Sequence, residues 1–170
     1  MADAILLIIM ALSLVALYLL LKSGFKVAPP PSGTKPAGAS YLPTLPGAAP
    51  AQHWSDGGRL QTEVMAESRY QGTVRQLAGE HGEQNANVPA QAILAVDEHN
   101  PYEDKPVAVF ISGQMVGYLS PRDTVAFHKQ QARQEITGQA VSCDAAIRGG
   151  GLWQGKRLSY AVWLDIEPGK

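Results

Sequence analysis

Residues 107–119 constrain the fold of this chain more than any other stretch, because they combine two apolar segments with a tight turn. Residues 107–111 are all apolar, and their larger side chains alternate with the period of two that is typical of a strand covered on both faces. Ser112 and Gly113 suit a two-residue turn, since glycine readily adopts positive φ, and apolar character then resumes. A hairpin covered on both faces predicts a small barrel or sandwich.

Two prolines define the segment before this hairpin. Pro101 and Pro106 fix φ and lack backbone donors, so the residues between them cannot lie in the middle of a strand. We therefore expect a rigid loop whose tip carries Tyr102, Glu103 and Asp104.

The rest of the chain predicts a mainly β fold with two short helices. Apolar periodicity predicts strands at residues 61–67, 90–96, 140–147 and 159–166 and helices at residues 70–78 and 121–134. The glycines at residues 149–151 predict a flexible turn. Five or so short strands with two helices indicate a small β-barrel.

The second helix has the clearest start signal. Ser120 can cap it and Pro121 suits its first position, while the carboxylate of Asp123 favours the positive end of the helix dipole. Its apolar stripe is thin, so we expect this helix on the surface of the barrel. The stripe consists of Val125, Ala132 and Ile136.

Residues 4–21 form an uncharged run that would span roughly 27 Å as a helix, close to the hydrocarbon thickness of a bilayer. We expect a single transmembrane helix within residues 1–26. A cleaved signal peptide is the alternative, but no Lys or Arg precedes the run and no good cleavage site follows it.

The charges after the run predict its orientation. Lys22, Lys26 and Lys35 all follow it, so the positive-inside rule places the C-terminal domain in the cytoplasm of a single-pass membrane protein. Cys143, the one cysteine, agrees with this location because no internal disulfide can form, and we expect it to be a small buried strand residue.

Residues 27–58 are rich in Pro, Ala, Gly, Ser and Thr. Such a segment buries too little apolar area to offset the entropy of ordering it, which predicts a disordered linker. A proline-rich ligand for another domain is the alternative. The folded domain is then expected at residues 59–170.

Three blocks of the chain resemble the HIRAN domain family. They are Asn100-Pro101-Tyr102-Glu103, Val107-Ala108-Val109 and Val116-Gly117-Tyr118-Leu119, and the upstream Ser68-Arg69-Tyr70-Gln71-Gly72 resembles the family's early tyrosine-containing turn. The resemblance spans residues 64–129. Glu103 departs from the pattern, because the family usually has aspartate there.

The resemblance implies an OB-like barrel that recognises the free 3′ end of single-stranded DNA. Tyr70, Tyr102 and Glu103 would then be the end-binding residues. An aromatic ring can stack on any base, and a carboxylate can accept a hydrogen bond from a 3′-hydroxyl while repelling a phosphate. The domain is slightly acidic after residue 57, so such binding must be local.

A second group of residues combines stacking with positive charge. Arg148, Lys156 and Arg157 bracket Trp153 around the glycine run, where a base and its phosphates can be contacted together. The alternative is a solvated turn whose tryptophan packs onto the barrel.

The sequence shows no pattern of a catalytic site, metal site or cofactor. Its four histidines are scattered and no nucleophile motif is present, so we expect a protein that is not an enzyme. We predict a membrane-tethered HIRAN-like module that binds a single-stranded DNA end. The alternative is a membrane-anchored module that binds a protein or peptide partner without nucleic-acid activity.

Overall fold

A computed structural model describes residues 41–65, 68–167 and 169 of the protein. These residues fall within one compact unit that begins at Ser40. In chain order the elements are β1 (Gln52–Trp54), β2 (Thr62–Glu63), η1 (Ser68–Tyr70), α2 (Gln71–Ala78), β3 (Ala86–Val96), β4 (Val107–Ile111), β5 (Gln114–Tyr118), α3 (Pro121–Arg133), β6 (Val141–Gly149), β7 (Leu152–Trp153), β8 (Lys156–Arg157) and β9 (Tyr160–Leu164).

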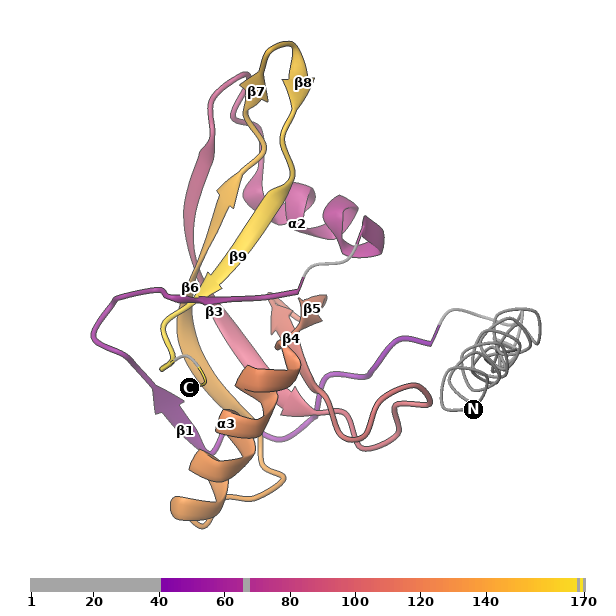
Figure 1. Ribbon diagram of the computed structural model, residues 1–170, viewed down its shortest axis with the longest axis vertical. Coiled ribbons are helices and arrows are strands. Elements are labelled where there is room, and N and C mark those ends of the chain that lie inside the picture. Colours follow the sequence, from indigo (N-terminus) through magenta and orange to yellow (C-terminus); the bar gives the residue numbers. More distant parts are fainter. Residues whose placement is uncertain (1–40, 66–67, 168, 170) are drawn as a thin grey trace, which may run out of the picture. The chain divides into compact units, whose positions relative to one another are not determined.

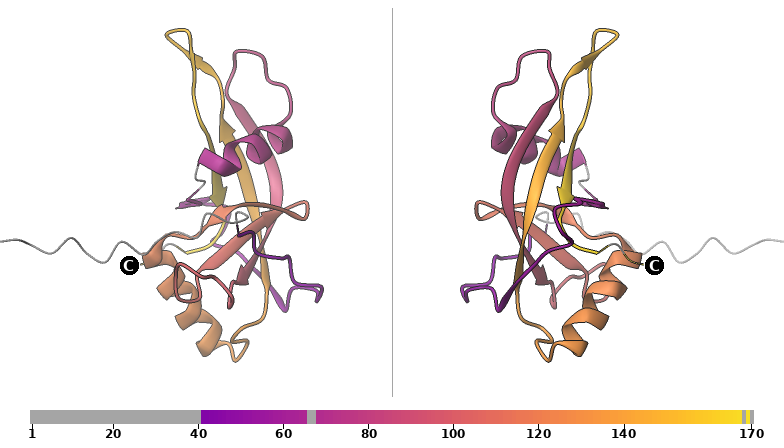
Figure 2. Two further views of the ribbon diagram at one scale, coloured as in Figure 1. Left: turned by 90° about the vertical axis from the view of Figure 1, so that its right-hand side faces the viewer. Right: turned by 90° about the vertical axis from the view of Figure 1, so that its left-hand side faces the viewer.

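One sheet dominates the described unit. Its strands lie in the order β2, β9, β6, β3, β4, β5, each antiparallel to its neighbour, and β1 adds to β6 in parallel. The sheet curls into a half-barrel, with α2 and α3 packed on it (Figure 1, Figure 2). The expected mainly β fold with two short helices is confirmed.

The predicted hairpin is present as β4 and β5. Ser112 and Gly113 have φ values of 48° and 77°, as a type I′ two-residue turn requires. Every residue of β4 is buried.

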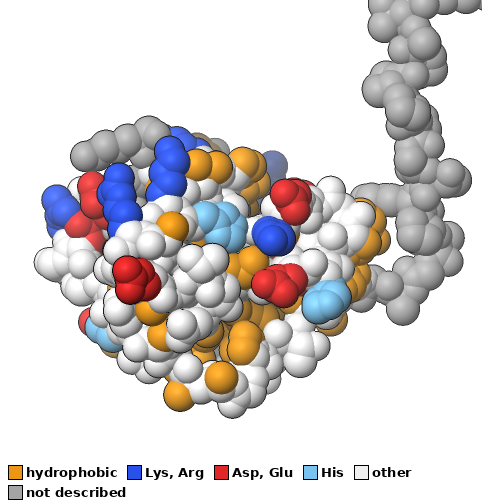
Figure 3. All heavy atoms as spheres, turned by 90° about the horizontal axis from the view of Figure 1, so that it is seen from below, with side chains coloured by type: hydrophobic (Ala, Val, Ile, Leu, Met, Phe, Trp, Pro, Cys, Tyr) orange, Lys and Arg blue, Asp and Glu red, His pale blue; other side chains and the backbone are white. Residues whose placement is uncertain are grey.

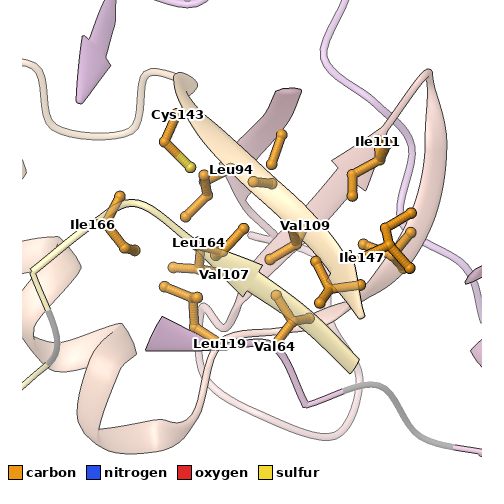
Figure 4. Close-up of a cluster of buried hydrophobic side chains, with 14 of the residues drawn as sticks. Val64, Leu94, Val107, Val109, Ile111, Leu119, Cys143, Ile147, Leu164 and Ile166 are labelled. Atoms are coloured by element: carbon orange, nitrogen blue, oxygen red, sulfur yellow. The ribbon is translucent and has the colours of Figure 1, made fainter. Parts of the chain in front are cut away.

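Side chains from β4 enter hydrophobic clusters on both faces of the sheet. The main core, drawn in Figure 4, receives Val107, Val109 and Ile111. A second cluster on the other face contains Ala108 and Phe110 together with Tyr70, Met115 and Ala140. The expectation of a strand covered on both sides is therefore confirmed.

α3 begins as predicted but buries a different face. The hydroxyl oxygen of Ser120 accepts a hydrogen bond from the backbone N–H of Asp123 at 3.1 Å. Phe127 is buried and its ring packs on Trp54 of β1, whereas Val125 is 52% exposed. Val125 and Ala132 of the predicted stripe are exposed, so that part of the prediction is wrong, whereas Ile136, which follows the helix, is buried in the main core.

Residues 41–58 belong to the folded unit, although their composition assigns them to the linker. β1 pairs with β6, the backbone N–H of Ala51 donates to the carbonyl of Ala140 at 2.8 Å, and Leu45 packs against the second cluster. The domain boundary at residue 59 therefore lies too late. Backbone pairing with a distant strand offsets the low apolar content of this segment.

The predicted membrane anchor at residues 4–21 and the linker up to residue 40 lie outside the described residues. Among the residues that the structure describes, no helix is long and apolar enough to cross a membrane.

The glycines at residues 149–151 do not form the expected flexible turn. A Cβ on Gly150 would lie 2.1 Å from the ring of Tyr160, so close packing requires glycine here. The chain continues into the β7–β8 hairpin, where Gln154 and Gly155 adopt positive φ.

Candidate functional site

Asp97, just after β3, is the centre of a polar network and is 6% exposed. Its Oδ1 accepts a hydrogen bond from the Tyr41 hydroxyl at 2.5 Å, and its Oδ2 accepts from the Tyr118 hydroxyl and from Nδ2 of Asn100, both at 3.0 Å. The Asp97 backbone N–H donates to the carbonyl of Pro106 at 2.8 Å. These bonds fix both ends of the loop between β3 and β4.

Asn100 fixes the tip of the same loop. Its Nδ2 also donates to the Tyr118 hydroxyl at 3.1 Å, and its Oδ1 accepts from the backbone N–H groups of Tyr102 at 2.9 Å and Glu103 at 3.0 Å. An asparagine that binds its own backbone in this way stabilises a turn. Tyr102 is 53% exposed and Glu103 is also exposed. Both side chains thus project from a fixed backbone.

The two tyrosines bound to Asp97 stay protonated at neutral pH. Burial, the hydrogen bond to Asp97 and the charge of its carboxylate raise the pKa of Tyr118 well above its usual value. The hydrogen bond to Asp97, followed by burial and charge, raises the pKa of Tyr41 to about 12. Both hydroxyls therefore act as donors to the carboxylate.

η1 brings another tyrosine and an arginine beside Tyr118. Tyr70 is buried in the second cluster, and the guanidinium carbon of Arg69 lies 4.6 Å from the centroid of its ring. The charge of Arg69 opposes the rise in the pKa of Tyr118, so the two groups lie within electrostatic range. Met65 and Tyr118 pair through their backbones and hold η1 in place. We call the following six residues the Asn100 surface: Arg69, Tyr70, Asn100, Tyr102, Glu103 and Tyr118.

The loop around the Asn100 surface is acidic. Glu98, Glu103 and Asp104 are exposed, and Lys105 is the one cation among residues 97–106. The Lys105 carbonyl lies 2.9 Å from Nε2 of His128 on α3, which ties the loop to that helix. A phosphate group is therefore repelled by most of this loop.

A hollow of about 490 Å³ adjoins Asp97. Residues 41–44 line one side of the hollow. The other side is lined by residues of β3 and β4 and by the start of the loop between these two strands. The segment before β1 thus contributes directly to the surroundings of the site.

The seven predicted binding residues fall into two separate groups. Tyr70, Tyr102 and Glu103 belong to the Asn100 surface. The other group lies at the opposite end of β3, beside the β7–β8 hairpin (Figure 1). Because β3 has 11 residues, it separates the groups by about 33 Å. The second group consists of Arg148, Trp153, Lys156 and Arg157.

Only part of this second group is available to a ligand. Trp153 is 62% exposed and pairs across the hairpin with the exposed Lys156, while Arg148 is exposed on β6. The guanidinium of Arg157 donates to the carbonyls of Gly82 at 3.1 Å and Gly150 at 2.7 Å. Arg157 thus holds the hairpin against the neighbouring loop.

The predicted binding residues omit Arg69, Asn100 and Tyr118 of the Asn100 surface, and Asp97 and Tyr41 beside it. Arg69, Asn100 and Tyr118 lie inside the blocks that resemble the HIRAN family, so a signal for them was present. Tyr41 gives no such signal, because its contact with Asp97 joins positions 56 residues apart.

Within the described ranges, no three His, Cys, Asp or Glu side chains are grouped so that they can hold a metal ion. Comparison of the chain with protein-family models, with curated proteins and with solved structures gives no match.

Proposed function

We propose that the folded unit binds the 3′ end of a single DNA strand at the Asn100 surface. The observation that carries the proposal is the placement of Tyr102 and Glu103, whose backbone N–H groups are both held by Oδ1 of Asn100. An exposed ring and an exposed carboxylate therefore stand next to each other on a fixed loop. The resemblance of the motif blocks to the HIRAN family supports this choice of ligand.

The two side chains suit the two parts of a strand end. The ring of Tyr102 stacks on the terminal base, which it does without regard to sequence. The carboxylate of Glu103 accepts a hydrogen bond from a 3′-hydroxyl and repels a 3′-phosphate. Together they select a free hydroxyl end over a phosphorylated one.

Tyr70 and Arg69 take different roles in this proposal. Tyr70 is 3% exposed, so we assign it to supporting the surface and not to stacking on a base. Arg69 is exposed above that ring and supplies a guanidinium for the nearest phosphate.

The test compares Tyr102→Ala and Glu103→Gln in the full chain, held in neutral detergent at low salt. Tyr102→Ala should weaken binding of a labelled single strand about ten- to a hundredfold, since one stacking contact contributes roughly 1–3 kcal/mol. Glu103→Gln should relax the discrimination against a 3′-phosphate, because the repulsion disappears while hydrogen bonding remains. Trp153→Ala removes an exposed ring at the far end of β3 and should change neither result.

Circular strands and strands with a 3′-phosphate complete the comparison. If they bind as tightly as a strand with a 3′-hydroxyl, end recognition is ruled out. If no strand binds in low salt, the proposal of nucleic-acid binding fails as a whole.

A protein- or peptide-binding module is the second candidate, and the charge of the loop favours it. Glu98, Glu103 and Asp104 are exposed around Tyr102, an arrangement that suits a basic peptide segment. This candidate predicts that the protein binds a Lys- and Arg-rich peptide and that Glu103→Gln weakens this binding. It also predicts that the protein does not distinguish between DNA ends.

We also propose that the curled sheet is an OB-like barrel and that residues 4–21 tether it to a membrane as a single-pass anchor, with the folded unit in the cytoplasm. After carbonate extraction the full chain should remain in the membrane pellet. Soluble protein whose sequence begins after residue 25 would contradict the tether.

A further inference from the structure

The outward face of α3 carries a group of three exposed cations. Arg122, Lys129 and Arg133 are exposed, and together with Val125 they follow one face of the helix at spacings of three and four residues. All four line a hollow of about 310 Å³, which Glu167 also borders. The opposite face of α3 is buried through Phe127 and Gln131.

Two of these cations form no ion pair with a described residue, although Glu167 borders the same hollow. Arg122 lies 3.7 Å from Oδ1 of Asp123. Across the residues that the structure describes, neither Lys129 nor Arg133 forms an ion pair. Figure 3, which views the molecule from below, shows several Lys and Arg side chains on one side of the molecule, with Asp and Glu side chains among them.

The same helix contacts the loop of the Asn100 surface. His128, next to Lys129 in sequence, lies 2.9 Å from the Lys105 carbonyl through its Nε2. The acidic loop offers little attraction for phosphate, and the α3 cations begin one residue from the point of contact.

We infer that Arg122, Lys129 and Arg133 bind the phosphates of the strand that leads away from the Asn100 surface. The inference rests on the proposed function and extends it from a terminal nucleotide to a longer single strand. Arg133 follows Arg122 by eleven positions of helix, a distance of about 16 Å along the axis, which spans more than one phosphate. The ring of Tyr102 then holds the end, and α3 supplies most of the charge-dependent affinity.

An anionic membrane surface is the competing occupant, and the composition of the face argues against it. Helices that lie on bilayers present a broad apolar side to the lipid. Here the apolar side of α3 is buried against Trp54, and Val125 is the one large apolar side chain on the cationic face.

The experiment compares strands of two lengths, both with a 3′-hydroxyl, on the full chain in neutral detergent. The strands have two and about fifteen nucleotides, so that the shorter one carries a single internal phosphate and the longer one carries enough phosphates to follow α3. The variant is Lys129→Gln with Arg133→Gln, since glutamine favours a helix and both positions are exposed. We expect about a tenfold loss of affinity for the long strand, a salt slope smaller by about 1.4, and no change for the short strand.

Two controls match this variant. Lys129→Arg with Arg133→Lys keeps both charges and should bind the long strand like the wild type. Arg75→Gln removes an exposed cation from α2, away from the α3 face, and should have no effect.

The outcomes separate the inference from the proposed function. If the wild type binds both strands and the double glutamine variant binds the long one equally well, the inference fails and the proposed function stands. If the wild type binds neither strand, both fail. If the variant loses affinity only for anionic phospholipid in mixed micelles, α3 faces a membrane and the inference is overturned.

Discussion

The hydroxyl of Tyr41 donates a 2.5 Å hydrogen bond to Oδ1 of Asp97, and the other oxygen of this carboxylate accepts hydrogen bonds from Tyr118 and Asn100. Tyr41 comes from a proline-rich segment before the first strand, whereas Asp97 begins the loop between β3 and β4. This single contact joins the start of the folded unit to the candidate site. It also makes the site sensitive to changes in a segment whose composition resembles a linker.

Tyr41→Phe should lower the free energy of unfolding by about 1.5 kcal/mol at neutral pH, the scale of a hydrogen bond to a charged group. The pKa of Tyr41 is raised from 10.0 to about 12, so its contribution is fully present below pH 10 and is lost as the pH rises through about 12. The difference between wild type and variant should therefore shrink between pH 10 and 12. Urea unfolding at several pH values measures it, and a constant difference would disprove the assignment.

Asn100→Ala should release the loop without unfolding the sheet. The substitution removes the acceptor for the backbone N–H groups of Tyr102 and Glu103, so their hydrogen exchange should accelerate at least tenfold. Exchange in β4 should stay slow, because every residue there is buried. Asn87→Ala, an exposed amide on β3, is the control and should leave the loop protected. Unchanged exchange at Tyr102 in Asn100→Ala would show that the loop is held by other contacts.

Gly117→Ala tests the close approach of β5 to the segment before η1. Gly117 has a φ of +151°, and a Cβ there would lie 2.6 Å from the carbonyl oxygen of Met65. We expect a loss of about 3 kcal/mol in unfolding free energy, from backbone strain together with steric overlap.

Gly113→Ala is the matched control for Gly117→Ala. Gly113 also has positive φ but no atom within 4 Å of the added Cβ, so this variant should lose only about 1 kcal/mol. Urea unfolding of both variants separates the two terms. If both variants lose the same unfolding free energy, the steric overlap with Met65 does not destabilise Gly117→Ala.

Local signals predicted the elements that depend on local chemistry. The Ser112–Gly113 turn and the capping of α3 by Ser120 both follow from residues within four positions of one another, and both are present. β1 was missed because three residues in a proline-rich context give no periodic pattern. β1 forms because it pairs with β6, and the paired residues Gln52 and Val141 are about ninety positions apart in the sequence.

The same long-range effects explain the errors around α3 and the glycine run. Val125 was predicted to face the core, but α3 buries Phe127 against Trp54 of β1 and leaves Val125 exposed. The glycine run was predicted to be a flexible turn. The contact that requires a glycine at position 150 is made by the ring of Tyr160, ten residues further along the chain, so the run itself gives no sign of it. The Asn100 surface was predicted in part, since its residues lie within short motif blocks of the sequence. The contact of Tyr41 with Asp97 depends on how the chain folds back, so no local signal predicts it.

Cys143 should report on the attachment of β1. It is fully buried on β6, in register with Trp54 of β1 and Ala92 of β3, and burial raises the pKa of its thiol to about 12. Since the thiolate is the reactive form, iodoacetamide at pH 8 should label the native protein far more slowly than the unfolded chain. His53→Pro removes a backbone donor from the middle of β1 and should detach that strand.

We expect His53→Pro to increase the native labelling rate of Cys143 at least tenfold while the circular dichroism of the sheet is retained. The increase would follow from easier opening of the edge of β6 once β1 no longer covers it. Cys143→Ser in the same background is the control and should give no labelling. If His53→Pro leaves the rate unchanged in a folded protein, β1 does not protect the thiol, and the folded unit begins after it.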